Sequence, residues 1–223
     1  GQGTVVDAAG RVAAPRPLLP APDVAGLPAL HERPLVRLTL PPLPGAAGYR
    51  VQVARDEGFD ALLADVRSAT PELRIAGLAD GRYPMRLRAL DGSGLEGRDA
   101  VATLMLKARP EPPLPRAPAP RAVLRGSAVE FAWTASSEAA RYRLQLARDD
   151  GGTSPFGTPL LDLKDLAEPL HRADALPPGA YVWRLGSVRA DGNAGPLGDP
   201  LRFELRALPP QPAPPAPPAV GDR

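Results

Sequence analysis

Hydrophobic and polar residues alternate along several short stretches of this chain. In GYRVQVARD, residues 48–56, Tyr49, Val51 and Val53 alternate with polar or small residues. RYRLQLARD at 141–149 repeats the same pattern. Because successive side chains of a β-strand point to opposite faces, a period of two predicts strands with one buried face. No segment predicts an amphipathic helix longer than a turn or two.

The match between the two stretches continues on both sides of them. The repeat has a period of about 95 residues, which is the size of a whole domain rather than of a solenoid unit. Further pairs of corresponding segments are 36–40 with 129–133, 78–94 with 176–195, and 102–107 with 201–206. Short strands separated by Gly, Pro and Asp turns favour an antiparallel sandwich for each copy.

Each copy resembles a fibronectin type III module. A proline-rich entry precedes VEFAW, which ends in Trp133 at the place of the family's inner-face tryptophan, and a Leu-x-x-Gly-x-Tyr motif opens a later strand. The resemblance implies that the motif tyrosine hydroxyl bonds to backbone a few residues upstream. The residues expected to specify the fold are Trp133, Trp183, Gly81, Gly179, Tyr83 and Tyr181.

The first copy departs from the family pattern at two positions. Leu40 stands where the second copy has Trp133, which predicts a lighter core. Pro84 lies inside an expected strand and predicts either a β-bulge or a locally unpaired position, because proline has no N–H. The second copy also inserts residues near GGTSPFGTP at 151–159.

The fold class predicted is therefore all-β, with two tandem fibronectin type III-like antiparallel sandwiches, proline-rich linkers and a proline-rich tail. We expect residues 1–15 to end an upstream domain, 16–108 to form the first sandwich and 109–115 a linker. The second sandwich is expected at 116–207 and a disordered tail at 208–223. Proline restricts the backbone, so the linker is expected to be extended and poorly flexible.

Composition narrows the function classes. The chain has 223 residues, no cysteine and a formal charge of +2, so disulfides and thiolate chemistry are excluded. Of its 27 basic residues only Lys107 and Lys164 are lysines, and acidic residues are interspersed among the arginines. This mixture argues against nucleic-acid binding. No stretch is apolar for long enough to insert in a membrane. The richness in Ala, Pro, Gly and Arg indicates a GC-rich bacterial genome.

No catalytic, cofactor-binding or metal-binding residues are predicted, and we do not expect an enzyme. The two histidines, His31 and His171, are in non-equivalent positions, whereas a metal or acid–base site needs a cluster. No Gly-x-Ser-x-Gly motif occurs, and no helix follows the glycine-rich segments to make a phosphate loop. The segments 91–97 and 191–199 are interpreted as turns rather than calcium loops.

The outward faces of the predicted strands carry arginines. Arg50, Arg86 and Arg88 are expected to share one face in the first copy, and Arg143 and Arg184 in the second. One interpretation is a surface that binds carboxylates or phosphates, as on peptidoglycan stems or an acidic protein. The other is that Asp65, Asp162 and their neighbours pair with these arginines across strands.

The layout of the whole chain resembles the C-terminal half of bacterial envelope proteins that carry a FecR-type domain, often with a peptidoglycan-binding LysM module. GQGTVVDAAGRV followed by PRPLLPAPD and the two copies carries this resemblance. It implies a periplasmic or cell-envelope location, with a signal sequence upstream of Gly1, and a non-enzymatic role.

Three functions are compatible with this sequence. The first, which we favour, is an interaction and spacer region that binds a protein or a peptidoglycan-associated partner. The second is a sensor or relay part of a FecR-type signalling regulator. The third is a set of accessory modules of a secreted polysaccharide-acting enzyme. The residues upstream of Gly1 discriminate among the three, and the sequence sets no oligomeric state.

Overall fold

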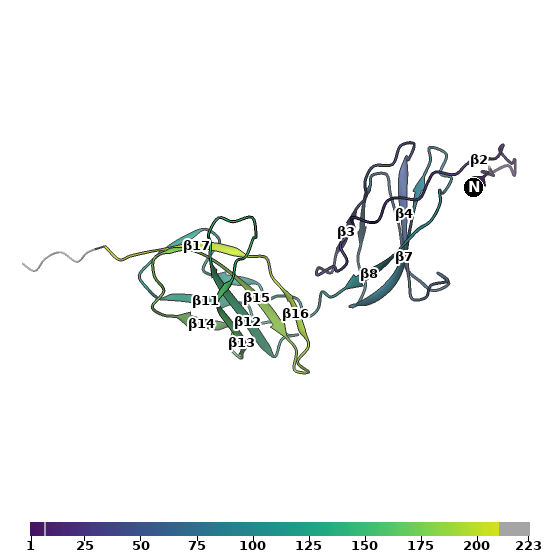
Figure 1. Ribbon diagram of the computed structural model, residues 1–223. Helices are drawn as coiled ribbons and strands as arrows, with labels where there is room; N and C mark the ends of the chain where they lie inside the picture. The colour runs from purple at the N-terminus through teal and green to yellow at the C-terminus, as the bar shows by residue number, and fades with distance from the viewer. Residues whose placement is uncertain (7, 210–223) are drawn as a thin grey trace, which may run out of the picture. The chain divides into compact units, whose positions relative to one another are not determined.

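The computed structural model describes residues 1–6 and 8–209, and the regular elements within them are β-strands (Figure 1). No helix that could span a membrane is found in this part of the chain. The chain divides into two compact units between Glu111 and Pro112, inside the expected linker 109–115. Of the tail expected at 208–223, the part after Pro209 lies outside the described residues.

The first module contains two sheets. One has the strand order β5-β4-β7-β8 and the other pairs β3 with β6, all antiparallel. The strands are β3 (Val36–Thr39), β4 (Gly48–Ala54), β5 (Leu62–Ser68), β6 (Glu72–Ile75), β7 (Gly81–Leu90) and β8 (Ala100–Leu106). Before them, β1 (Gln2–Gly3) and β2 (Arg16–Pro17) form a hairpin, which an Arg16–Asp91 ion pair of 2.8 Å ties to the module. That residues 1–15 end an upstream domain stays a prediction.

The second module has the same layout with three additional strands, β9, β10 and β16. Its sheets have the orders β14-β11-β9 and β10-β17-β15-β12-β13, with β16 beside β15. The strands are β9 (Pro115–Ala117), β10 (Ala122–Arg125), β11 (Val129–Trp133), β12 (Arg141–Arg148), β13 (Pro159–Leu166), β14 (Leu170–Ala173), β15 (Gly179–Val188), β16 (Ala194–Leu197) and β17 (Leu201–Arg206). The prediction of two tandem antiparallel sandwiches of the fibronectin type III kind is confirmed.

Each module buries its own core, as the alternating patterns predicted. Tyr49, Val51 and Val53 are buried in the first core, and Trp183 and Tyr181 are fully buried in the second. The two cores differ in chemistry. The second one is built from aromatic rings in edge-to-face contact, with centroids 5.2 Å apart for Phe131–Trp183 and 5.4 Å apart for Trp133–Tyr142. The first is largely aliphatic.

Leu40 and Trp133 occupy equivalent positions. The Leu40 N–H donates to Pro71 O at 3.0 Å, and the Trp133 N–H donates to Pro169 O at 3.1 Å. Both side chains are buried, at 2% and 3% exposure. The first core therefore fills the tryptophan position with a smaller side chain, as expected from the sequence.

The tyrosine corner predicted from the Leu-x-x-Gly-x-Tyr motif is present in both modules. The Tyr83 hydroxyl donates to Ala79 O at 2.9 Å, and the Tyr181 hydroxyl donates to Pro177 O at 2.5 Å. In each module the local geometry explains why the motif position is a glycine. A Cβ on Gly81 would lie 2.9 Å from the Tyr83 hydroxyl, and Gly179 has a φ of 152° that side chains rarely adopt.

The bulge considered for Pro84 is not formed. The β7–β8 register runs through Pro84 and Thr103 without a shift, whereas the pairing of β7 with β4 ends at Met85. Because hydrogen-bonding direction alternates along a strand, the nitrogen of Pro84 faces the side of β4, just beyond the last pair. The missing N–H therefore interrupts no ladder.

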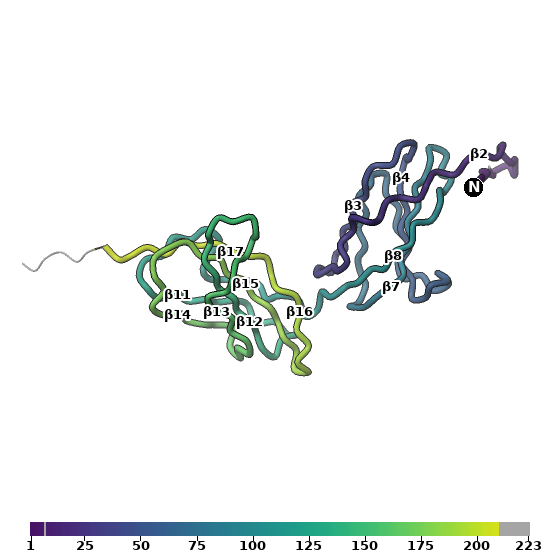
Figure 2. The backbone as a smooth tube through the Cα atoms, in the orientation of Figure 1, coloured from purple at the N-terminus to yellow at the C-terminus, as the bar shows by residue number. Residues whose placement is uncertain are grey.

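The described part of the first module has no counterparts of β9 and β10. Its entry segment, residues 18–35, contains Pro20, Pro22, Pro28 and Pro34 and forms one isolated bridge, between His31 and Leu106. Proline cannot donate to a ladder, so this segment makes isolated backbone contacts, such as Arg98 N to Leu19 O at 2.9 Å, rather than a strand. In Figure 2 the purple segment after β2 crosses the module before turning into β3.

The expected linker is shorter than 109–115, because both of its ends belong to the modules. Ala108 and Arg109 donate their backbone N–H groups to the Asp80 carboxylate at 2.7 and 3.1 Å. At the other end β9 already begins at Pro115. Residues 110–114 remain as the connection between these ends.

Candidate binding surface on the outer arginine faces

A continuous polar chain crosses the outer face of the second module. Arg143 donates to both oxygens of Asp162, at 2.7 Å from Nε and 2.6 Å from Nη2. The Gln145 amide donates to Asp162 at 3.1 Å and accepts from Arg184 Nε at 2.8 Å. The Arg184 guanidinium then lies over the Phe156 ring, 4.0 Å from its centroid. We refer to these five residues as the second array.

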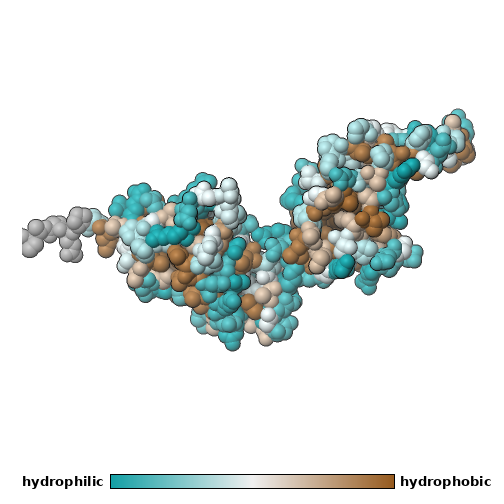
Figure 3. Space-filling view, in the orientation of Figure 1, coloured by the Kyte–Doolittle hydropathy of each residue, from teal (hydrophilic) through white to brown (hydrophobic). Residues whose placement is uncertain are grey.

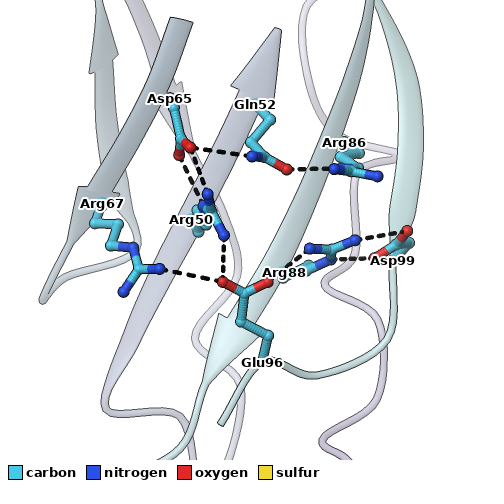
Figure 4. Close-up of polar contacts among 8 residues, drawn as sticks. All are labelled: Arg50, Gln52, Asp65, Arg67, Arg86, Arg88, Glu96 and Asp99. Carbon is cyan, nitrogen blue, oxygen red and sulfur yellow. Dashed lines mark hydrogen bonds and ion pairs between the residues drawn. The ribbon is translucent and has the colours of Figure 1, made fainter. Parts of the chain in front are cut away.

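The first module repeats this chain with Arg50, Asp65, Gln52, Arg86 and Phe59, which we refer to as the first array. Figure 4 shows the polar contacts of Arg50, Asp65, Gln52 and Arg86. Arg50 binds both oxygens of Asp65, one of them from Nε at 2.7 Å. The Gln52 amide donates to Asp65 at 3.0 Å and accepts from Arg86 Nε at 2.7 Å. The Arg86 guanidinium lies over the Phe59 ring, 4.5 Å from its centroid.

Strand register explains why the two arrays coincide. Gln52 lies directly opposite Asp65 on β5 and Arg86 on β7. Gln145 has the same place between Asp162 and Arg184. An amide can donate from its nitrogen and accept at its oxygen, so it links a carboxylate on one side to a guanidinium on the other.

Both glutamines are only 4% exposed, although their position in the alternating pattern put them on the outer face. The roles of the two glutamines and of Phe59 and Phe156 were not predicted from the sequence. The Arg-x-Gln shared by the two repeats was a usable signal. A second signal was the single phenylalanine in each of the corresponding turns, since the whole chain has four.

The first array has an extension that the second lacks. Arg67, Arg50 and Arg88 lie directly opposite one another across β5, β4 and β7. Glu96 accepts from all three, at 3.3 Å from Arg67, 2.5 Å from Arg50 and 2.6 Å from Arg88. Asp99 also binds Arg88. In the second module Gly186 takes the position of Arg88, opposite Arg143.

These contacts keep the carboxylates ionised. Hydrogen bonds from Arg50 lower the pKa of Asp65 to about 2, and hydrogen bonds from Arg143 lower the pKa of Asp162 to about 2. Burial alone raises the pKa of Glu96, but hydrogen bonds from Arg88 and Arg50 outweigh it and the net pKa is lowered. A general acid or base near neutral pH needs a pKa close to 7, which these groups do not have.

The predicted arginines differ in their hydrogen-bond partners. Arg50 pairs with Asp65 and Arg143 with Asp162, as one interpretation of the sequence expected. Arg88 pairs with Glu96 and Asp99. Arg86 differs from these, because within the described residues its one hydrogen bond, from Nε, goes to an uncharged amide. Ligand binding by Arg50, Arg86, Arg88, Arg143 and Arg184 stays a prediction.

The two histidines lie apart from the arrays. Burial lowers the pKa of His31, whose backbone pairs with the end of β8. His171 belongs to β14 in the other module. Among residues 1–6 and 8–209, no three His, Cys, Asp or Glu side chains are grouped to hold a metal ion.

No protein-family model and no curated protein matches this sequence. Among solved structures, the chain is similar to the FN1–FN3 domains of chicken CNTN1, with 15% identity, a TM-score of 0.39, and coverage of 92% of this chain and 77% of that one. It is also similar to fibronectin(III)-like modules of CbhA from Clostridium thermocellum, with 18% identity, a TM-score of 0.31, and coverage of 84% and 94%. The fold assignment of the chain rests on the strand orders of its own two sandwiches.

Proposed function

We propose that this chain is a non-catalytic interaction and spacer region of a bacterial cell-envelope protein that carries a FecR-type domain. The observation that supports this most is the duplicated array. Two modules with different cores and different loops hold an arginine in the same way, with Nε on a buried glutamine and the guanidinium on a phenylalanine ring. A guanidinium held in place loses little freedom on binding, so it suits recognition of carboxylates.

The ligand class follows from this chemistry. Arg86 keeps its two Nη groups for a ligand, because within the described residues only its Nε donates a hydrogen bond. Two parallel N–H donors match the two oxygens of a carboxylate. Carboxylates of peptidoglycan stems or of an acidic protein are therefore the proposed targets of the outer face.

The electrostatics support a binding role over a catalytic one. The carboxylates beside the arginines have low pKa values and are already bonded, so they neither donate nor accept protons near neutral pH. The prolines of the linker favour an extended connection, which supports a spacer role. The envelope setting and the FecR-type partner domain rest on the resemblance carried by residues 1–22.

The test is co-sedimentation of the chain with isolated peptidoglycan sacculi, together with crosslinking to an envelope extract. Arg86→Gln combined with Arg184→Gln removes both guanidiniums and keeps the residues of the Arg50–Asp65 and Arg143–Asp162 pairs unchanged. Loss of a charge-assisted contact predicts retention weakened about tenfold. Arg37→Gln with Arg74→Gln, on β3 and β6 of the other sheet, is the matched control and is expected to change nothing.

Unchanged retention of the array variant on sacculi and on every crosslinked protein would show that the arrays are structural only. Sequencing of the gene on the 5′ side of the Gly1 codon tests the setting separately. A FecR-type domain supports the proposal, whereas a hydrolase domain would favour accessory modules of an enzyme. A membrane helix with a cytoplasmic regulatory segment would favour signalling.

A further inference from the structure

Strand β8 ends the four-stranded sheet of the first module, and most of its outer edge is uncovered. Within the described residues, the backbone contacts to this edge come from His31, whose N–H donates to Met105 O at 2.8 Å and whose carbonyl accepts from Lys107 N at 2.9 Å. Hydrogen-bonding direction alternates along a strand, so Val101 and Thr103 point their N–H and C=O groups to the same side as Met105. In the described part of the chain these groups have no partner.

The equivalent strand of the second module is covered. Strand β10 lies parallel to β17, pairing Ala122 with Phe203 through to Arg125 with Arg206. Arg121 N donates to Arg202 O just before that ladder. The difference follows from the entry segments, since residues 121–126 contain no proline and 18–35 contain four.

The outward side chains of β8 also leave its edge open to pairing, in contrast to those of β17. Pairing with β7 and β15 makes Thr103 equivalent to Arg202 and Met105 equivalent to Glu204, and Val101 corresponds to Pro200. Charges and prolines on an edge strand prevent pairing with other chains. The second module has them, whereas in the first Val101 is 64% exposed and Met105 is 43% exposed.

Strand β8 is also distinct among the edges of this chain. Of the described strands of four or more residues that end a sheet, β8, AVATLML, is the one without charge or proline. At the other end of the same sheet β5 carries Asp65 and Arg67. Figure 3 shows apolar surface among polar residues on the visible face of this module. A β-rich apolar edge of this kind is a template for strand addition.

We propose that β8 pairs with β8 of a second copy of this chain, antiparallel and centred on Ala102. Val101 of each copy then lies opposite Thr103 of the other, and the open N–H and C=O groups of both residues are satisfied. His31 keeps its place on Met105, because the paired stretch ends before it.

The lack of charge on β8 favours a second copy as its partner. A charged strand would find no counter-charge on β8, whereas a second copy brings an equally uncharged strand. On the neighbouring strand β7, Arg82 and Arg86 lie opposite Met105 and Val101. Across the dimer they are separated by three strand spacings, about 14 Å. This exceeds the Debye length of about 8 Å at physiological salt, so their repulsion is screened.

The experiment is sedimentation velocity and light scattering of the full chain over a concentration series. We expect a concentration-dependent species of twice the 23.4 kDa chain mass. Amide exchange of Val101 and Thr103 should slow as concentration rises. Val101→Pro copies the second module at this position, and Thr103→Lys adds a charge; each should keep the melting midpoint and abolish the dimer. Val123→Lys, at a 50% exposed valine on β10, is the matched control and should dimerise like the wild type.

Three results would overturn the proposal. One is a wild-type chain that stays monomeric up to about 1 mM, the weak end of specific association. Another is a dimer lost in Val123→Lys and kept in Val101→Pro. The third is a monomer whose Val101 and Thr103 amides become protected only when an acidic extended peptide is added, which assigns the edge to another partner. The array variants should dimerise normally, so this test is independent of the proposed function.

Discussion

The guanidinium of Arg184 lies over the ring of Phe156, 4.0 Å from the ring centroid. The loop that supplies this ring is longer than its counterpart, since 17 residues separate Gln145 from Asp162 and 13 separate Gln52 from Asp65. Even so, Phe59 takes the same place under Arg86. Two loops of different length and sequence thus deliver the same ring to the same arginine.

Removal of this ring should be measurable in the stability of the second module. A cation–π contact at a partly exposed site contributes about 0.5–1 kcal/mol. We expect Phe156→Ala to lower the free energy of unfolding by about 1 kcal/mol in urea denaturation, and Phe156→Leu, which keeps apolar contact, to lower it by less. Equal losses in the two variants would assign the effect to apolar packing rather than to the ring.

The two aspartates of the arrays should make stability depend on pH in the acid range. Their folded pKa values of about 2 lie below the value near 3.9 of an unfolded aspartate. The stabilisation is therefore complete above about pH 4 and is lost as the pH falls from about 4 through about 2. Urea denaturation at a series of pH values measures it.

The control for that dependence is the amide variant. Asp65→Asn and Asp162→Asn cannot ionise, so each should be less stable than the wild type at neutral pH. Each should also lose less stability between pH 4 and pH 2. A variant that keeps the full acid dependence of the wild type would assign it to other carboxylates. Asp174→Asn, whose own pair with Arg172 is largely exposed, serves as the surface reference.

The free energy of unfolding of the second module should depend strongly on Trp183 in its aromatic core. The side chain is fully buried and packs edge-to-face on Phe131. Trp183→Ala leaves a large cavity, for which we expect a loss of about 3–5 kcal/mol in the free energy of unfolding. Trp183→Phe should cost less, because it keeps a ring in the cavity and removes a buried indole N–H that has no partner among the described residues. An unchanged melting midpoint in Trp183→Ala would contradict this role.

The tyrosine corners and the cores were predictable from the sequence because each depends on local pattern. Alternation identified the buried faces around Tyr49 and Tyr142, and the spacing from Gly81 to Tyr83 identified the corner. Pro84 occupies a locally unpaired position, the second of the two alternatives considered for it. Whether Pro84 lies inside or beyond the β4 ladder depends on how far β4 and β7 overlap. The residues around Pro84 do not predict this overlap.

In the arrays the ion pairs were predictable from the sequence, whereas the contacts that depend on strand register were not. Pairing of Arg50 with Asp65 follows from charge and from adjacent strands. The links through Gln52 and Phe59 depend on cross-strand register and on a turn conformation, since Phe59 itself has a positive φ of 60°. Glu96 enters from the turn after β7 and joins three arginines of three strands, a convergence that exists only once the sheet is formed.

The corner hydrogen bond should contribute modestly to each module. Tyr83→Phe removes the hydroxyl that donates to Ala79 O, and we expect a loss on the order of 1 kcal/mol in the free energy of unfolding. Tyr181→Phe should cost at least as much, because Tyr181 is fully buried whereas Tyr83 is half-buried. Differential scanning calorimetry of the single variants measures both, and no loss in either would mean that the bond contributes nothing to stability.

Glu96 should be the most salt-sensitive single residue of the first array. It lies among Arg67, Arg50 and Arg88, so Glu96→Gln leaves three guanidiniums side by side with Asp65 and Asp99 as their remaining counter-charges. Like charges on directly opposite strand positions are destabilising, and hydrogen bonds to charged groups contribute about 1.5–3 kcal/mol. Because the carboxylate is partly solvated, we expect a loss at the lower end of that range in low salt.

Salt separates repulsion from lost packing in this variant. At 1 M salt the Debye length falls to about 3 Å, so repulsion among the arginines is largely screened. Glu96→Gln should therefore regain part of its lost stability in urea denaturation at high salt, whereas Glu72→Gln, at an exposed position of β6, should change little at either salt. In the second module Gly186 replaces the third arginine, so no single carboxylate there should show this behaviour. A deficit of Glu96→Gln that salt does not reduce would mean that Glu96 acts through its hydrogen-bond geometry and not through its charge.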